Sequence, residues 1–282
     1  MALGILTNVA ATYAENNLNQ TQGSLQKVLQ QLSSGSRINS GADDAAGLAV
    51  ADGLAANEAA LTQSAQNAQN GVGLLQTADG ALSQVTNLLN RAVTLATEAA
   101  NGTLTAGQVS SADAEYQNIL TEIGNIGTST NFNSSAVFSG TATNFVVSDG
   151  TTAGTTTFAD TIGALTTASI GTATGGGAGE DLSASTLTAA GAAAELAKIT
   201  TAIADVANQR GTIGANINQL NAAASVASSE QVNLSAAESS IRSTNYGQAT
   251  SDLAKFQVLS QTGISALAQA NSVQQEILKL LQ

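Results

Sequence analysis

The chain contains no cysteine, no histidine and no proline. Without cysteine it can form neither a disulfide bond nor a thiolate metal site. Without histidine it lacks the commonest general base and the commonest metal ligand of enzymes. We therefore predict a protein that is not an enzyme and that holds no cofactor and no metal. The absence of proline means that no residue of this kind interrupts a long helix.

Charge and aromatic side chains are also scarce. Charged residues make up 10% of the chain, against roughly 25% in typical soluble domains, and aromatic residues make up 3%. The formal net charge is −12, and no lysine or arginine lies between Arg91 and Lys198. This balance disfavours nucleic acid and anionic membranes as partners, since both attract basic patches. We also expect no transmembrane helix and no cleavable secretory signal, because the chain has no long apolar run.

Two columns of apolar residues recur at every seventh position. The first column is Leu54, Leu61, Ala68, Leu75, Leu82, Leu89 and Ala96, and the second is Ile199, Val206, Ile213, Leu220, Ala227, Leu234 and Ile241. A seven-residue apolar repeat forms one stripe along a long helix, and another helix must cover such a stripe. We predict a chain that runs out along one helix and returns along another, as suits a rod or a polymer subunit.

The remaining pattern completes this prediction. It indicates helices over about 2–33, 40–100, 105–128, 188–241 and 248–281, and short strands at 137–138, 145–147 and 155–158. Asp149-Gly150 is a turn signal, and the glycines at 175–177 indicate a loop. The predicted fold class is mainly α: a long antiparallel coiled-coil-like rod with paired N- and C-terminal helices and a small β-rich central insert.

The two terminal helices carry weaker apolar stripes that must cover one another. The residues expected to pack there are Leu18, Leu25, Leu32, Leu253, Phe256, Leu267, Ile277 and Leu281. Isolated amphipathic helices depend on tertiary contacts for their stability. We therefore expect residues 1–40 and 245–282 to be mobile in the monomer and to become helical on polymerisation.

Two segments carry a family resemblance. The run Leu32–Val50, which reads LSSGSRINSGADDAAGLAV, is very similar to the N-terminal motif of bacterial flagellins. The run Gln257–Asn271, which reads QVLSQTGISALAQAN, is similar to the other end of that family, and Asn87–Arg91 and Asn101–Thr103 also resemble it. The resemblance covers roughly residues 1–135 and 195–282.

The resemblance implies a subunit that polymerises into the bacterial flagellar filament for swimming motility. It implies secretion in an unfolded state through a type III apparatus, and an extracellular location in the filament. The implied partners are further copies of the chain, an export chaperone, and cap and hook-associated proteins. The implied domains are an inner terminal-helix domain (1–43 and 244–282), an outer helical rod domain (44–131 and 187–243) and a small surface-exposed variable insert (132–186).

The resemblance also assigns candidate site residues. Arg37, Asn39, Asp43 and Asp44 lie where inner and outer domains join and are candidates for contacts between subunits, although they also fit an ordinary capped turn. Arg91, Leu95 and Glu115 match positions through which a vertebrate Toll-like receptor recognises the family, although a solvated arginine beside a packed leucine explains them too. Asp43 and Asp44 do not favour a catalytic or metal pair, because adjacent helical residues face different directions.

Two alternatives remain open at the level of the sequence. A hook–filament junction protein shares these termini, although the short middle segment favours the major filament subunit. A secreted adhesin or surface-layer protein with an acidic, threonine-rich face belongs to a different class. Deletion of the last 30 or so residues separates the two classes, because a flagellin then loses polymerisation whereas an adhesin with a central binding region keeps its binding.

Overall fold

The computed structural model describes residues 8–149, 157–171 and 179–280. The helices are α1 (Val9–Ser34), α2 (Ala45–Ala99), α3 (Ala106–Ser129), α4 (Ala192–Arg242) and α5 (Tyr246–Leu280). The strands are β1 (Asn131–Phe132), β2 (Ser135–Ala136), β3 (Ala142–Val146) and β4 (Thr157–Thr161). The prediction of a mainly α-helical chain with paired terminal helices and a small β-rich insert is confirmed.

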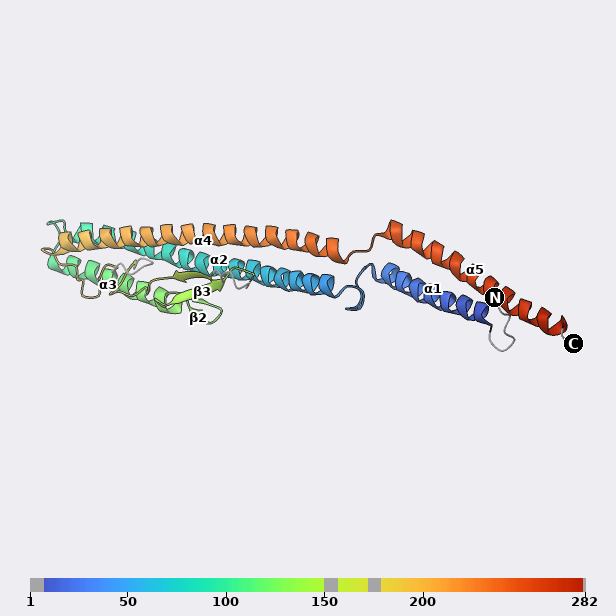
Figure 1. The fold of residues 1–282 in the computed structure, drawn as a ribbon. Helices are drawn as coiled ribbons and strands as arrows, with labels where there is room; N and C mark the ends of the chain where they lie inside the picture. The colour runs from blue at the N-terminus through green and yellow to red at the C-terminus, as the bar shows by residue number, and fades with distance from the viewer. Residues whose placement is uncertain (1–7, 150–156, 172–178, 281–282) are drawn as a thin grey trace. The chain divides into compact units, whose positions relative to one another are not determined.

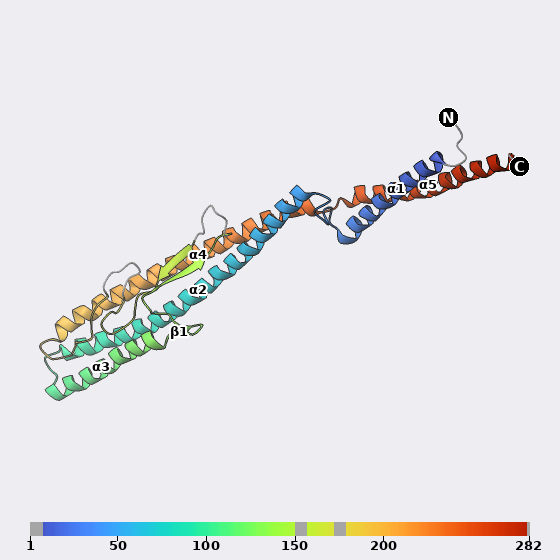
Figure 2. The same cartoon turned by 60° about the horizontal axis from the view of Figure 1, so that its bottom comes forward.

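The chain divides into two compact units. One unit comprises residues 57–232 and contains α3, both strand pairs and most of α2 and α4. In this unit α2 and α4 lie side by side in both views, and α3 lies along α2 (Figures 1 and 2). The other unit comprises Met1–Ala56 and Asn233–Gln282, and α1 and α5 are its principal helices.

Local sequence signals set the ends of the helices. α1 ends at Gly35, which has a φ of 71° and donates its N–H to the carbonyl oxygen of Gln31 at 2.9 Å. A left-handed residue of this kind ends a helix at little steric cost only when it is glycine. α3 begins with a capping box, in which the side chains of Thr105 and Gln108 each bond to the backbone N–H of the other residue.

The two seven-residue columns form the core of the 57–232 unit. From Leu61 to Ala96 every member of the first column is 2% exposed or less, and so is every member of the second from Ile199 to Ala227. Leu54, Leu234 and Ile241, at the other ends of the columns, are only partly buried. α3 adds a third helix to this core through Tyr116, which is fully buried.

The central insert contributes to the same core. Its buried apolar side chains are Val137, Phe138, Ile162, Leu165, Ile170 and Leu182, and Leu187 directly after it is also buried. One close approach explains a glycine of α3, because a Cβ at Gly127 would lie 1.9 Å from the carbonyl oxygen of Leu165. The segment therefore acts largely as a covering layer over the helices.

The strands differ in detail from those predicted. β1 pairs with β2 and β3 pairs with β4, both antiparallel, and Phe145 lies opposite Phe158. The prediction of a strand at Val137–Phe138 is wrong, because these residues form a turn after β2 and point their side chains into the core. The predicted turn at Asp149-Gly150 and the glycine loop at 175–177 fall partly or wholly outside the described residues.

Candidate assembly interface and joint

The backbone itself joins the terminal helices to α2 and α4. Ser36 and Ser243 form an antiparallel bridge. On either side of it, the N–H of Arg37 donates to Arg242 O at 2.6 Å, and the N–H of Thr244 donates to Gly35 O at 3.0 Å. Residues 35–37 and 242–244 thus satisfy each other's backbone groups. This joint lies wholly within the unit that contains α1 and α5.

The structure places Arg37 at the C-terminal end of α4. Its guanidinium Nη2 donates to the carbonyl oxygen of Ile241 at 2.9 Å, and the residue is exposed. The last carbonyls of a helix have no partner within the helix and carry a partial negative charge, so a cation there is favourable. Arg37 therefore contacts a backbone acceptor, and the ion pair at Asp43 is made by Lys27 instead, with Nζ 2.8 Å from Oδ1.

Asp43 organises the turn before α2. Its Oδ2 accepts the backbone N–H of Asn39 at 3.2 Å, and the N–H and hydroxyl of Ser40 at 3.0 and 3.1 Å. The hydrogen bond from Lys27, followed by that from the Ser40 hydroxyl, lowers the pKa of Asp43 to about 2. Asn39 adds a bond from its side-chain amide to Ser36 O at 2.9 Å. At neutral pH the Asp43 carboxylate is therefore ionised, and its hydrogen bonds hold the turn together.

Asp44 caps α2. Its Oδ1 accepts the N–H of Gly47 at 2.8 Å, which satisfies one of the free donors of the first turn. A Cβ at Gly47 would lie 2.4 Å from the Asp44 carboxylate and 2.9 Å from Ile38. The four joint residues predicted from the sequence therefore all have intramolecular roles, and these roles do not prevent contacts with another copy.

Sequence reasoning missed Arg242 as a member of the joint. Its Nη1 lies 3.0 Å from Glu238 of α4 and 3.7 Å from Asp52 of α2. The only available signal was the position of a basic residue in the last turn of a predicted helix, where it complements the helix dipole.

Helices α1 and α5 pack against each other, but most of their side chains stay exposed to solvent. Asn8 and Gly35, near the two ends of α1, lie against Ala270 and Tyr246 of α5, so the helices run antiparallel. Among the described residues of the two helices, only Val28 and Ala249 are buried. Several large apolar side chains are exposed: Val9, Tyr13, Leu29, Tyr246, Val258, Leu259, Ile264 and Val273.

An open groove of about 670 Å³ lies between α1 and α5. Its lining includes Leu18 from α1, and Phe256, Leu259 and Gly263 from α5. A Cβ at Gly263 would lie 3.3 Å from the Leu18 side chain, so the two helices approach closely at this level. The groove is therefore lined by both apolar side chains and polar ones, such as Asn17.

The residues predicted to pack between the terminal helices are all partly buried where the structure describes them. These are Leu18, Leu25, Leu32, Leu253, Phe256 and Leu267. Ile277 lies in α5, but its side chain falls outside the described part, as does the whole of Leu281.

Arg91 and Glu115 form a bidentate ion pair on the surface of the 57–232 unit. Arg91 Nε and Nη2 lie 2.7 and 3.0 Å from the two carboxylate oxygens, and the side chains are 54% and 47% exposed. The hydrogen bond raises the pKa of Arg91 and lowers that of Glu115. Leu95, predicted to act with them, is 2% exposed and belongs to the core. A protein partner could reach the ion pair but not the leucine.

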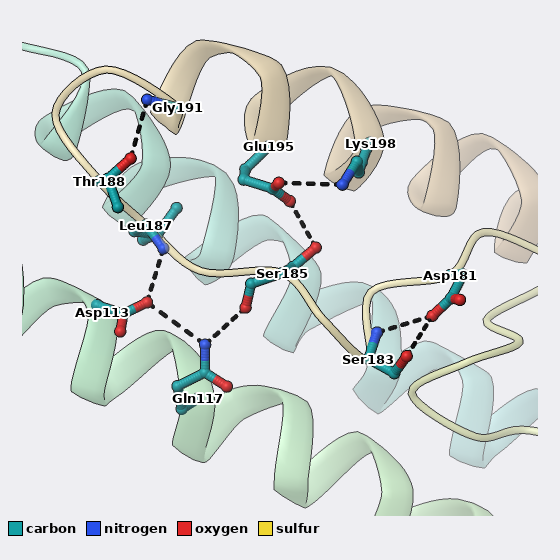
Figure 3. Close-up of polar contacts among 10 residues, drawn as sticks. All are labelled: Asp113, Gln117, Asp181, Ser183, Ser185, Leu187, Thr188, Gly191, Glu195 and Lys198. Atoms are coloured by element: carbon teal, nitrogen blue, oxygen red, sulfur yellow. Dashed lines mark hydrogen bonds and ion pairs between the residues drawn. The ribbon is translucent and has the colours of Figure 1, made fainter.

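A polar cluster around the buried Ser185 connects the segment before α4 to the helices (Figure 3). Ser185 is 2% exposed; its hydroxyl donates to Glu195 at 2.5 Å, and its carbonyl accepts the side-chain amide of Gln117 at 2.7 Å. Asp113 accepts the backbone N–H of Leu187 at 2.7 Å. Glu195 also pairs with Lys198 at 3.0 Å, as Figure 3 shows.

Most members of this cluster are only partly buried, and its hydrogen bonds connect neighbouring segments of the fold. It therefore acts as a structural clasp. Within the described residues, no group of three or more acidic side chains is arranged to hold a metal ion. None of the described helices is long and apolar enough to cross a membrane.

Comparison with known proteins identifies two matching regions. The bacterial flagellin N-terminal helical region matches residues 5–143, and the bacterial flagellin C-terminal helical region matches residues 196–281. Flagellin FlaB2 of Treponema pallidum (strain Nichols) is 32% identical, over 97% of this chain and 98% of that protein. The flagellar filament 33 kDa core protein of Treponema phagedenis is also 32% identical, with the same coverage.

Other similarities are partial. Flagellin 1 of Proteus mirabilis is 42% identical over 54% of this chain and 41% of its own length. The crystal structure of Bacillus cereus flagellin is 31% identical and matches with a TM-score of 0.47, over 61% of this chain and 94% of that one. The two Treponema proteins are thus similar over nearly their full length, whereas the match to the longer Proteus protein spans less than half of its length.

Proposed function

Since the chain belongs to the bacterial flagellin family, and is thus a structural subunit of the flagellar filament, we propose that it polymerises through its terminal helices α1 and α5. The observation that carries this proposal is the exposed apolar surface of the pair. Leu259, Ile264 and Val273 of α5 are 43%, 50% and 43% exposed. Burying a fully exposed side chain of this kind contributes about 1.5–3 kcal/mol. Covering the exposed half of each of these side chains therefore contributes roughly half of that, and neighbouring copies of the same helices can supply the cover.

The joint at 33–44 separates two functional parts in this proposal. Residues 1–43 and 244–282 form the inner, polymerising part; residues 44–131 and 187–243 form the outer helical part, with 132–186 as its insert. The ladder at Ser36 and Ser243 supports this division, because it fixes the path of both connecting segments. Arg37→Ala is expected to impair assembly more than helix content, since the guanidinium of Arg37 bonds to a carbonyl at the very end of α4.

The exposed apolar face of α5 also suits a role in export. We propose that the chain leaves the cell unfolded through a type III apparatus, and that an export chaperone holds the apolar face of α5 before assembly. A helix laid in an apolar groove is a common mode of recognition. Cap and hook-associated proteins, which meet the ends of the filament, are further proposed partners of α1 and α5.

Recognition by a vertebrate Toll-like receptor is a separate proposal. Arg91 and Glu115 support it, because both are about half exposed and present a fixed pair of opposite charges. Leu95 would act only by positioning α2 against the core, since its side chain is 2% exposed.

The assembly proposal is tested with a matched pair of variants in α5. Phe256 lines the groove between α1 and α5, whereas its neighbour Gln257 is exposed. Phe256→Ser should abolish polymerisation from filament seeds, and Gln257→Ser should leave it intact, as measured by sedimentation and electron microscopy. Circular dichroism of the monomers should show that the core helices are present in both. Normal filaments from Phe256→Ser would refute the proposal.

A further inference from the structure

The hairpin of β3 and β4 is seated on α2 and α4. Phe145 and Phe158 stack with their ring centroids 6.5 Å apart. Phe145 lies over Gly71 of α2, where an added Cβ would be 3.3 Å from Phe145 and 2.9 Å from Leu220 of α4. A two-stranded hairpin is marginally stable alone, so these contacts with the helices decide whether it stays folded.

Polar contacts fasten the hairpin on both sides. On α2, Asn67 donates its side-chain amide to Val146 O at 3.2 Å, and Ser64 donates to Ser148 O at 2.5 Å. On α4, Asn216 donates its side-chain amide to Asp160 Oδ1 at 2.8 Å. The contact with α4 thus depends on an ionisable residue, whereas the contacts with α2 do not.

Asp160 is poorly satisfied for a buried acid. It is 2% exposed, and its second oxygen, Oδ2, has no hydrogen-bond partner among the described residues. A buried carboxylate without a cation is costly in its charged form. Burial, the largest cause, raises the pKa of Asp160, and the hydrogen bonds from Asn216 and Thr161 only partly oppose it.

Among the residues that the structure describes, no lysine or arginine forms an ion pair with Asp160. Neither β3 nor β4 contains another titratable side chain. The nearest charged residue along α4 is Arg210, which pairs with Asp79 of α2 at 2.7 Å. The ion pairs of the described residues all involve other carboxylates.

From this geometry we infer that Asp160 is a proton-linked latch: the β3–β4 hairpin is held most firmly on α4 when Asp160 is protonated, and loosens when the side chain ionises. The direction follows from linkage. A carboxyl group whose pKa is higher in the docked state binds its proton more tightly there, so docking weakens as pH rises above the ordinary value of 3.8. One proton can change the opening equilibrium by at most about tenfold per pH unit.

The test is amide hydrogen exchange of residues 142–146 and 157–161 in the full-length monomer between pH 4 and pH 7, corrected for the intrinsic exchange rate. In the native chain, the opening equilibrium of the hairpin should increase with pH. Asp160→Asn keeps the shape and the contact with Asn216 but cannot ionise, so its opening should be independent of pH and smaller than native at pH 7. Glu230→Gln removes an exposed carboxylate from α4 and should behave like the native chain.

A second variant keeps the inference testable if Asp160→Asn does not fold. Asn216→Ala removes the donor that steadies the ionised form, so its opening at pH 7 should exceed the native value by several-fold while its opening at pH 4 stays closer to native. Equal pH dependence in the native chain and in Asp160→Asn would overturn the latch. So would a hairpin that opens more readily in Asp160→Asn than in the native chain at pH 7. Both experiments use the monomer, so their failure leaves the assembly proposal untouched.

Discussion

The two compact units bury their apolar stripes to very different extents. In the unit of residues 57–232, the facing stripes of α2 and α4 are covered by each other, by α3 and by the insert, and side chains such as Leu82 and Val206 are fully buried. In the other unit, α1 and α5 have only each other, and their stripe residues, such as Leu18 and Phe256, are partly exposed. The same helical periodicity therefore closes a core in one unit and leaves apolar side chains exposed in the other, where we propose that neighbouring copies bind.

The largest expected difference between the units concerns a leucine from each. Leu82→Ala empties a fully buried site in α2 and should lower the free energy of unfolding of the monomer by about 2–5 kcal/mol. Leu259→Ala removes a side chain that is 43% exposed in α5 and should change it by less than about 1 kcal/mol. Chemical denaturation of both monomers measures this difference. Equal losses would show that α5 is part of the monomer's cooperative core.

The packing of the insert on α3 can be tested at one close contact, between Gly127 and Leu165. Gly127→Ala places a Cβ against the carbonyl oxygen of Leu165, so α3 and the insert must separate, at a cost of about 1–3 kcal/mol. Gly80→Ala is the matched control, because a Cβ there meets nothing within 4 Å. The control should be neutral or stabilising by up to about 1 kcal/mol, since glycine is unfavourable within a helix. Similar thermal midpoints for the two variants would contradict the close contact of the insert.

The joint should respond to acid at a defined pH. The folded-state pKa of Asp43, about 2, lies below the ordinary 3.8, so its stabilising contacts are fully present above the ordinary value and are lost as pH falls through about 2. Asn39 and Ser40 donate their N–H groups to this carboxylate, so their amide chemical shifts report its ionisation. Those shifts should titrate near pH 2 in the native chain, and the transition should vanish in Asp43→Asn. A transition at the ordinary pKa would show that Lys27 does not hold the turn.

The smallest expected effect on stability is at Arg91. Its ion pair with Glu115 is exposed, and exposed pairs contribute little because water and salt screen them. Arg91→Ala should therefore leave the thermal midpoint of the monomer almost unchanged. If the proposed recognition by a vertebrate Toll-like receptor is right, Arg91→Ala and Glu115→Ala should both weaken binding to the receptor ectodomain. If both variants bind as well as the native chain, the ion pair is not a recognition element.

Much of the helical architecture could be predicted from the sequence. A seven-residue repeat directly encodes which face of a helix is covered, so the columns through Leu75 and Ile213 predicted the core. The helix ends predicted near residues 33 and 40 lie within a few residues of Gly35 and Asp44, which cap α1 and α2. The resemblance of the two ends of the chain to flagellins supplied the family.

The rest depended on contacts that no local pattern carries. Val137 and Phe138 have the composition of a strand but form a turn, because their side chains fill a space above the helices. Arg37 was predicted as a member of the joint, but its acceptor is a backbone carbonyl, and a sequence does not show which backbone groups a side chain will reach. Asp160 could not be recognised as a buried acid, because only the docking of its strand on α4 removes it from water.

The central claim is that the 57–232 unit is stable by itself whereas α1 and α5 need neighbouring copies. Amide hydrogen exchange of the monomer and of the assembled filament tests it most directly. The account predicts that α2, α3 and α4 are protected alike in both states, and that α1 and α5 are strongly protected only in the filament. Equal protection of α1 and α5 in monomer and filament would contradict it.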